Sequence, residues 1–186
     1  MKPIAMLLCV AAILAACGLG GTREADRYFI LEASAPADGG IIHRDVRALP
    51  TTAASFYDTQ SIAYSLEPGT RAYYQFNHWT ERPQSAIHAL LASRFPAGDA
   101  QPRLILETHV VEIYHDAVAP PGTAHITVSA ALVEPQSRAT IAQRTFTRSA
   151  RSASYDAAGA VRAFDAALGS LLDDIAAWVE VEGKPR

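Results

Sequence analysis

The clearest hydrophobic pattern of the chain lies in its last quarter. Between Asp156 and Gly183, apolar residues recur every three or four positions, which is the spacing of one face of an α-helix. These positions are Ala157, Val161, Phe164, Leu168, Leu171, Leu172, Ile175 and Val179. Asp156 is a candidate N-cap, and Gly183 is typical of a helix end. We therefore predict a helix of about 25 residues, roughly 37 Å long, which can cover one face of a sheet.

In three segments that precede this helix, apolar and polar residues alternate as they do in β-strands, and short turns join the segments. They span 104–115, 123–134 and 140–148. The middle segment has the cleanest alternation, with its inward residues predicted to be Ile126, Val128, Ala130 and Leu132. The first segment has apolar residues at both odd and even positions, which predicts either a β-bulge or burial on both faces of the strand. Consecutive strands with short turns predict an antiparallel meander.

The first half of the chain predicts a β-hairpin followed by a helix. Segments 61–66 and 71–76 are strand-like, and Glu67-Pro68-Gly69-Thr70 between them is typical of a type II turn. Within residues 82–95, the apolar residues fall on one stripe at helical spacing, and Pro83 lies in the first turn of the predicted helix. Shorter strands are predicted over 28–31 and 41–49, and a loop over 51–59. The order of elements predicts an α+β fold, in which a mostly antiparallel β-sheet is covered by two helices in a single domain.

The N-terminus has the layout of a bacterial signal peptide. One basic residue, Lys2, precedes an apolar run of about ten residues, whereas a helix that crosses a bilayer needs about 20. The run leads into Leu14-Ala15-Ala16-Cys17, which looks like a lipobox, in which Cys17 receives a diacylglycerol. We predict a signal peptide over 1–16 and a lipidated, glycine-containing tether over 17–26. An ordinary signal peptide, or a buried helix that contains a cysteine, is the alternative.

Composition narrows the classes of function. The chain has 186 residues, about one domain, with 16 Lys and Arg against 19 Asp and Glu and a net charge of −3. The basic residues form no block, which argues against nucleic acid as a partner. Both cysteines, Cys9 and Cys17, lie in the signal region. The domain predicted over 27–182 therefore has no thiol for a disulfide, a metal site or nucleophilic catalysis.

Candidate catalytic and metal-binding groups are sparse. His109, His115 and His125 lie on neighbouring predicted strands, but residues six apart along a strand are about 20 Å apart. We therefore expect exposed strand histidines rather than a zinc site. Asp173 and Asp174 are adjacent on the last helix and point about 100° apart, which indicates a solvated face. With no nucleophile elbow and no zinc-protease motif, we expect no enzyme, no metal and no cofactor beyond the covalent lipid.

One further aspartate has a single interpretation, and three arginines have two. Asp165 is predicted to lie on the outer face of the last helix. Arg144, Arg148 and Arg151 follow one another along the last predicted strand and just beyond it. These arginines are either a solvated strand edge and loop, or a small positive patch that contacts an acidic partner or a lipid headgroup.

The densest aromatic stretch runs from Tyr73 to Trp79. On a strand, Tyr74 and Phe76 share one face, so one side of the hairpin can pack into the core while the other stays free. Trp79 lies at the corner between this strand and the following helix. It is either a core plug or part of an exposed aromatic surface for a partner. In the second case the partner-binding set is Tyr74, Phe76, His78 and Trp79.

Several stretches make the sequence resemble a known family. The two most specific are Tyr57-Asp58-Thr59-Gln60-Ser61-Ile62-Ala63-Tyr64 and Tyr73-Tyr74-Gln75-Phe76-Asn77-His78-Trp79, followed by Pro83 and a helix through Leu90-Leu91. The opening Tyr28-Phe29-Ile30-Leu31 and the ending from Ala163-Phe164-Asp165 to Leu171-Leu172 and Trp178 fit as well. Together they look like the ABC-type transport auxiliary lipoprotein family (PqiC-like), over nearly all of 27–182. The sequence departs from the family at His78, where arginine is common.

The resemblance implies a lipoprotein that faces the periplasm of a Gram-negative envelope. Such proteins are not enzymes, and they accompany an ABC-type system whose mammalian-cell-entry (MCE) domain protein is thought to move lipids between membranes. Gly18 after the lipidated cysteine favours the outer membrane, with the inner membrane as the alternative. Our leading hypothesis is an accessory subunit, anchored through Cys17, that docks the MCE assembly. A carrier of lipid or another hydrophobic ligand and a purely structural envelope lipoprotein are the alternatives, and homo-oligomerisation stays open.

Overall fold

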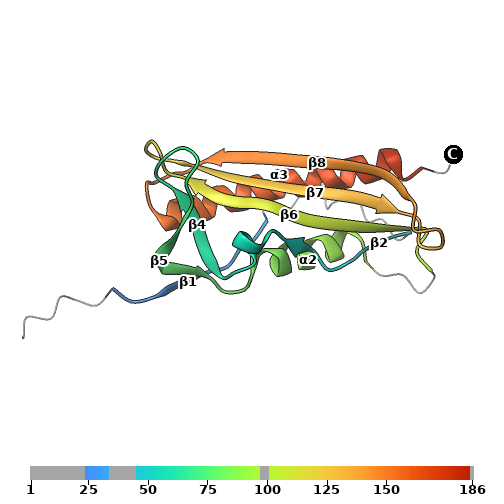
Figure 1. The fold of residues 1–186 in the computed structure, drawn as a ribbon, viewed down its shortest axis with the longest axis horizontal. Coiled ribbons are helices and arrows are strands. Elements are labelled where there is room, and N and C mark those ends of the chain that lie inside the picture. The colour runs from blue at the N-terminus through green and yellow to red at the C-terminus, as the bar shows by residue number, and fades with distance from the viewer. Residues whose placement is uncertain (1–23, 34–44, 97–100, 185–186) are drawn as a thin grey trace, which may run out of the picture.

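A long antiparallel meander forms the middle of the molecule, as the alternating segments predicted. The computed structural model describes residues 24–33, 45–96 and 101–184. Within them, β6 (Leu104–Asp116), β7 (Thr123–Val133) and β8 (Thr140–Arg151) lie side by side (Figure 1). The four residues of β7 that were predicted to point inward are at most 2% exposed, which confirms the alternation.

A bulge in β6 changes which residues of the strand face the core. The register of β6 with β7 shifts between Val110 and Glu112. Leu106 and Val110 are buried before the shift, and Ile113 and His115 are buried after it. One extra residue therefore moves the inner face from even to odd positions, as a β-bulge does. This confirms the bulge that the mixed parity predicted.

Shorter strands complete a sheet of eight strands in the described residues. They are β1 (Arg27–Phe29), β2 (Val46–Ala48), β3 (Thr52–Ala53), β4 (Ser61–Ser65) and β5 (Ala72–Trp79). β4 and β5 form the predicted antiparallel hairpin. The edge of β6 that does not pair with β7 pairs along its length with β2, β3 and β4, all of which run parallel to it. β1 runs parallel to β5. The loop predicted over 51–59 therefore contains β3, and it also contains a 3₁₀ turn over Ser55–Tyr57.

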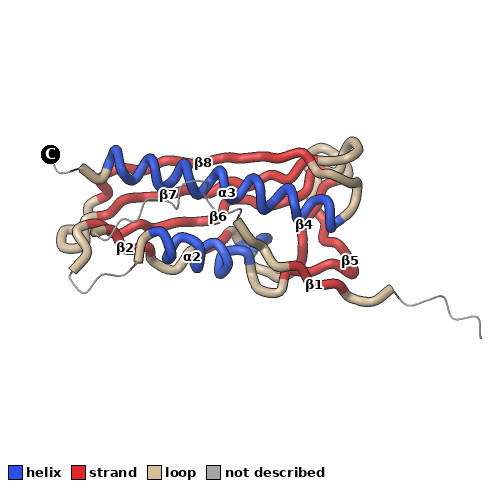
Figure 2. Tube along the Cα trace, turned by 180° about the vertical axis from the view of Figure 1, so that it is seen from behind, coloured by secondary structure: helices blue, strands red, loops and turns tan. Residues whose placement is uncertain are grey.

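Two helices cover the same face of the sheet (Figure 2). The first, α2 (Pro83–Arg94), begins at a proline, as predicted. The second, α3 (Ala157–Glu182), is capped by Asp156, whose carboxylate accepts the N–H of Gly159 at 2.6 Å, and it ends at Gly183. The side chains of α3 that face the sheet, such as Leu168 and Leu171, are 0% exposed. This confirms the α+β fold with a mostly antiparallel sheet and two helices.

The carboxylates of α3 are less solvated than the sequence suggested. Asp173 lies 2.6 Å from Nη1 of Arg94, a residue of α2 that is only 8% exposed, and Asp174 pairs with Arg148 of β8. Asp165 is half-buried and accepts a backbone N–H from the segment after β1 at 3.0 Å, and burial raises its pKa. The prediction of a solvated outer face was wrong for Asp165 and Asp174, because the N-terminal segment and β8 approach α3 there, whereas Asp173 is exposed, as predicted, although it pairs with Arg94.

The predicted signal peptide, Cys17 and most of the tether lie outside the described residues, as do residues 41–44 of the predicted strand over 41–49. The division into 1–16, 17–26 and 27–182 therefore stays a prediction. Among the helices of the described ranges, none combines the length and the apolar character that crossing a bilayer demands.

Candidate functional site

The aromatic residues that were predicted to bind a partner lie on β5, and the structure separates them into two groups. Trp79 is 1% exposed, and its ring meets Phe164 of α3 edge-on with centroids 5.5 Å apart. Trp79 is therefore the core plug, and its alternative place on an exposed aromatic surface was wrong, because the end of β5 packs against α3. Tyr74, Phe76 and His78 are partly exposed.

Two of these partly exposed residues make contacts within the chain. The hydroxyl of Tyr74 lies 2.8 Å from Nδ1 of His115, and burial raises the pKa of Tyr74 to about 12. The Tyr74 hydroxyl therefore stays protonated at neutral pH and can donate a hydrogen bond to the imidazole of His115. Nε2 of His78 lies 3.6 Å from a carboxylate oxygen of Asp26, and its ring packs against an aromatic ring of β1. A partner-binding role for Tyr74, Phe76 and His78 stays a prediction.

His115 is a buried polar side chain that ties three parts of the chain together. It is 0% exposed, with Nδ1 at Tyr74 of β5 and Nε2 3.2 Å from the hydroxyl of Ser152, which precedes α3. A Cβ on Gly122 (φ +87°) would lie 2.0 Å from Nε2, so this turn requires glycine. The prediction of exposed strand histidines was wrong here, because the bulge turns His115 inward. Its shared parity with the apolar Ile113 was the signal that could have revealed this.

Acid is expected to destabilise the fold through His115. Burial lowers the pKa of His115, although the carbonyl of Pro121 and the charges of Asp116 and Asp156 oppose this shift. The unfolded chain therefore binds this proton more readily than the folded chain. The stability that neutral His115 contributes is complete above the unfolded pKa of about 6.5, and it is lost as the pH falls below that value.

Urea unfolding at pH values from about 8 down to about 5 tests this prediction. We expect the midpoint of the wild-type protein to fall more steeply with acid than that of His115→Gln, which cannot titrate at this position. Parallel pH profiles for the two proteins would contradict the assignment.

The helix-free face of the sheet holds the other two strand histidines. His125 stacks on Tyr114 with centroids 5.2 Å apart, and its Nε2 lies 4.0 Å from a carboxylate oxygen of Asp116. Nδ1 of His109 lies 2.8 Å from the hydroxyl of Thr52. Within the residues that the structure describes, no three His, Cys, Asp or Glu side chains gather as a metal site requires.

β8 is an edge strand whose charge is opposite to that of the whole chain. It lies at the end of the sheet order, next to β7, and its sequence contains three arginines and no acidic residue. Arg148 pairs with Asp174 of α3. Arg144 lies over the ring of Phe146, 5.2 Å from its centroid. Neither Arg144 nor Arg151 forms a salt bridge with another described residue, so part of this positive charge is available to a partner.

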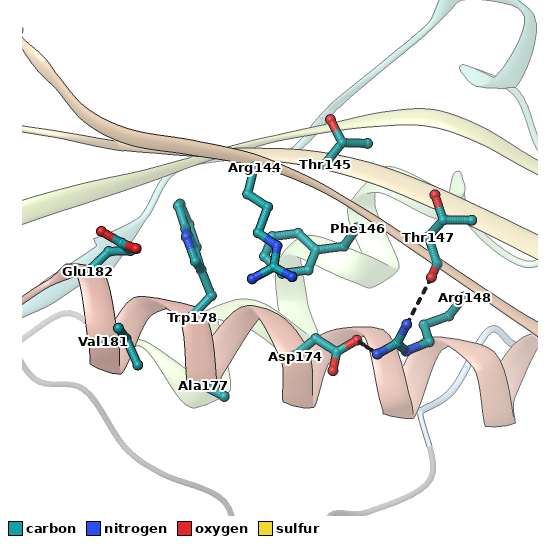
Figure 3. A pocket seen from close by; sticks show the side chains of 10 residues that line it. All are labelled: Arg144, Thr145, Phe146, Thr147, Arg148, Asp174, Ala177, Trp178, Val181 and Glu182. Carbon is teal, nitrogen blue, oxygen red and sulfur yellow. Dashed lines mark hydrogen bonds and ion pairs between the residues drawn. The ribbon is translucent and has the colours of Figure 1, made fainter.

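A groove runs between β8 and α3 beside this edge (Figure 3). Its floor is apolar, because the rings of Phe146 and Trp178 meet edge-on with centroids 5.6 Å apart. Arg144 reaches across the groove from β8, and the pair of Arg148 and Asp174 lies to one side of it (Figure 3). The groove thus combines an apolar floor, a free arginine and the open edge of a sheet, which together can bind an extended chain.

Solved structures with the same fold are recognisable at low sequence identity. A Xanthomonas campestris protein of the DUF330 family is 19% identical, with a TM-score of 0.74, and the match covers 84% of this chain and 96% of that one. A second solved protein, described as uncharacterised, is 14% identical, with a TM-score of 0.64, and the match covers 84% and 99% of the two chains. At this level of identity the likeness concerns the fold alone. No curated protein matches the sequence.

A family model establishes the relationship more directly. The model of the ABC-type transport auxiliary lipoprotein component matches residues 31–176, which include most of the described sheet, all of α2 and most of α3. Proteins of this description are lipoproteins of the cell envelope that serve as auxiliary components of ABC-type transport. The chain therefore belongs to the ABC-type transport auxiliary lipoprotein family.

Proposed function

We propose that the protein is a non-catalytic accessory subunit, held in the outer membrane by lipid on Cys17, that docks the MCE-domain assembly of an ABC-type lipid transport system. The family match over residues 31–176 carries this proposal, because it covers most of the folded domain. Gly18, rather than aspartate, after Cys17 supports the outer membrane. The role of the domain would be to bind and position its partner rather than to make or break bonds.

The edge of β8 is the docking surface that the geometry favours. An edge strand presents backbone N–H and C=O groups that can pair with an added strand. Arg144 and Arg151 on this edge form no salt bridge within the described ranges, whereas the chain as a whole carries a net charge of −3. Charge complementarity therefore favours an extended, acidic segment of the MCE-domain partner, with an apolar side chain of that segment on Phe146 and Trp178.

A carrier function has less support from the structure. A lipid held between the sheet and the helices needs open space there. Side chains from both layers fill that space, and Ile126, Val128, Leu168 and Leu171 are all 0% exposed. The groove of Figure 3 lies at the edge of the sheet, and its lining comes from β8 and α3 alone. We therefore do not propose the carrier as a second function.

Affinity purification of the lipidated full-length protein from detergent-solubilised membranes tests the proposal, with mass spectrometry of proteins and lipids. We expect an MCE-domain protein to be recovered with the wild type. The double variant Arg144→Glu and Arg151→Glu reverses the free charge on β8 and should reduce this recovery at least about tenfold, which corresponds to about 1.4 kcal/mol of binding free energy.

A charge-matched control separates the β8 edge from a general effect of net charge. Arg27→Glu with Arg162→Glu makes the same change at two exposed residues, one on β1 at the opposite end of the sheet order and one on α3, and it should retain the partner. Equal losses in the two double variants would contradict docking at β8. Recovery of stoichiometric lipid without an MCE-domain protein from the wild type would contradict the accessory function and favour the carrier.

A further inference from the structure

Three loops at one end of the molecule expose apolar side chains. The turn after β4 contributes Leu66 (54% exposed), the loop after β6 contributes Val118 (44%), and the loop before α3 contributes Tyr155 (49%). Ala119 and Pro120 lie beside Val118 and are exposed as well. We call these five residues the apolar tip.

Hydrogen bonds hold the three loops together around Ala117. The N–H of Ala117 donates to the carbonyl of Ser65, the residue before Leu66, at 2.8 Å. The carbonyl of Ala117 accepts from the hydroxyl of Tyr155. The N–H of Ser152 donates to the carbonyl of Gly122 at 3.0 Å. The apolar tip is therefore a fixed surface of the folded domain.

The apolar tip lies at the end of the molecule where the tether joins the domain. β1 begins at this end, together with the turn after β4 and the loop after β6, whereas the C-terminus lies at the other end (Figure 1). The pKa of Asp156, next to Tyr155, is lowered first by the N–H of Gly159 and the hydroxyl of Ser154, and to a smaller extent by the charge of Arg27. The direction of this small effect agrees with the placement of β1 and of the tip loops at the same end of the domain (Figure 1).

The length of the tether limits how far the apolar tip can stand from the bilayer. Cys17 precedes the first described residue, Glu24, by seven positions, which span at most about 25 Å when fully extended. Once acyl chains on Cys17 are in the bilayer, this end of the domain stays within a few nanometres of the headgroups. An exposed apolar surface in that place, with a tyrosine at its border, suits the interface between headgroups and acyl chains.

We infer that the apolar tip of Leu66, Val118, Ala119, Pro120 and Tyr155 inserts shallowly into the bilayer that holds the lipid anchor and so fixes the orientation of the domain. This inference rests on the lipid anchor of the proposed function. The acidic residue on the same turn, Glu67, is exposed and stays at headgroup level. The long axis of the sheet then points away from the membrane, and β8 stays accessible to a partner.

A fluorescent label at the apolar tip tests the inference. Only Cys9 and Cys17 are present, in the signal region, so Val118→Cys gives the mature lipoprotein a single free thiol for an environment-sensitive dye. The lipidated protein is reconstituted into phosphatidylcholine and phosphatidylethanolamine vesicles. We expect a blue shift of the dye emission and a loss of intensity when doxyl-labelled lipids are included. Gln136→Cys, on the exposed turn between β7 and β8, should show neither change.

Further readouts separate failure of the inference from failure of the lipid anchor. If the protein floats with the vesicles but the label at position 118 stays in water, the anchor is supported and the inference is overturned. If the protein does not float with the vesicles, both fail. A label that becomes shielded only when an MCE-domain protein is added also overturns the inference, since the tip is then a protein interface. In the labelled protein, Leu66→Asp with Ala119→Asp should return the label to water while circular dichroism stays unchanged.

Discussion

Cys17→Ala is expected to move the protein from the membrane fraction to the soluble periplasmic fraction and to abolish its function. Each buried methylene group of an acyl chain contributes about 0.8 kcal/mol to membrane binding, and stable anchoring takes more than one chain. The apolar tip alone exposes too little apolar surface to replace such chains. Cell fractionation followed by intact-mass analysis measures both the location of the protein and the presence of the acyl groups.

Cys9→Ala provides the matched control, because this cysteine lies within the predicted signal peptide and should not be acylated. It should leave the protein in the membrane at full activity. A Cys17→Ala protein that stays bound to the membrane and active would refute the lipid anchor, and with it the interpretation of Leu14-Ala15-Ala16-Cys17 as a lipobox.

Trp79→Ala is expected to be the most destabilising single change on β5, by about 3–5 kcal/mol of unfolding free energy. The indole ring is buried against Phe164, so its removal leaves a cavity between the sheet and α3. Tyr28→Ala truncates a neighbouring aromatic residue that is 61% exposed, and it should change stability by about 0.5 kcal/mol or less. Denaturant unfolding of the two variants measures the difference.

The same pair of variants separates the two roles considered for Trp79. A core plug affects stability first and partner recovery only through loss of folded protein. If Trp79→Ala unfolds at the wild-type denaturant midpoint but no longer recovers an MCE-domain protein, the role of Trp79 as a core plug is wrong.

Elements with a strong local pattern could be predicted from the sequence. The helix α3, the strands of the meander and the hairpin of β4 and β5 each bury one face, and their apolar residues therefore repeat at the matching period. The parallel pairings of β2, β3 and β1 could not be predicted in this way. These strands have only two or three residues each, which is too short for a period, and their partners are distant in the sequence.

The candidate site was predicted less well than the fold, for a physical reason. Burial of Trp79 depends on α3 passing over it, which its own strand does not reveal, whereas the burial of His115 could be inferred only after the bulge in β6 is placed, from the parity that it shares with Ile113. The arginines of β8 were identified as an alternative positive patch. Their division into a paired Arg148 and unpaired Arg144 and Arg151 follows from the position of α3 beside the edge, which no spacing in β8 reveals.

The way in which β6 gathers its neighbours also sets the order in which the domain can assemble. β2, β3 and β4 all precede β6 in the chain, and each uses the same edge of β6 as its partner. A chain that emerges from its N-terminus, from the ribosome or across a membrane, therefore presents three strands before their common template exists. Until β6 follows, β4 can pair with β5, but β2 and β3 lack the strand that they pair with, and the non-local closure of the sheet is a slow, late event in folding.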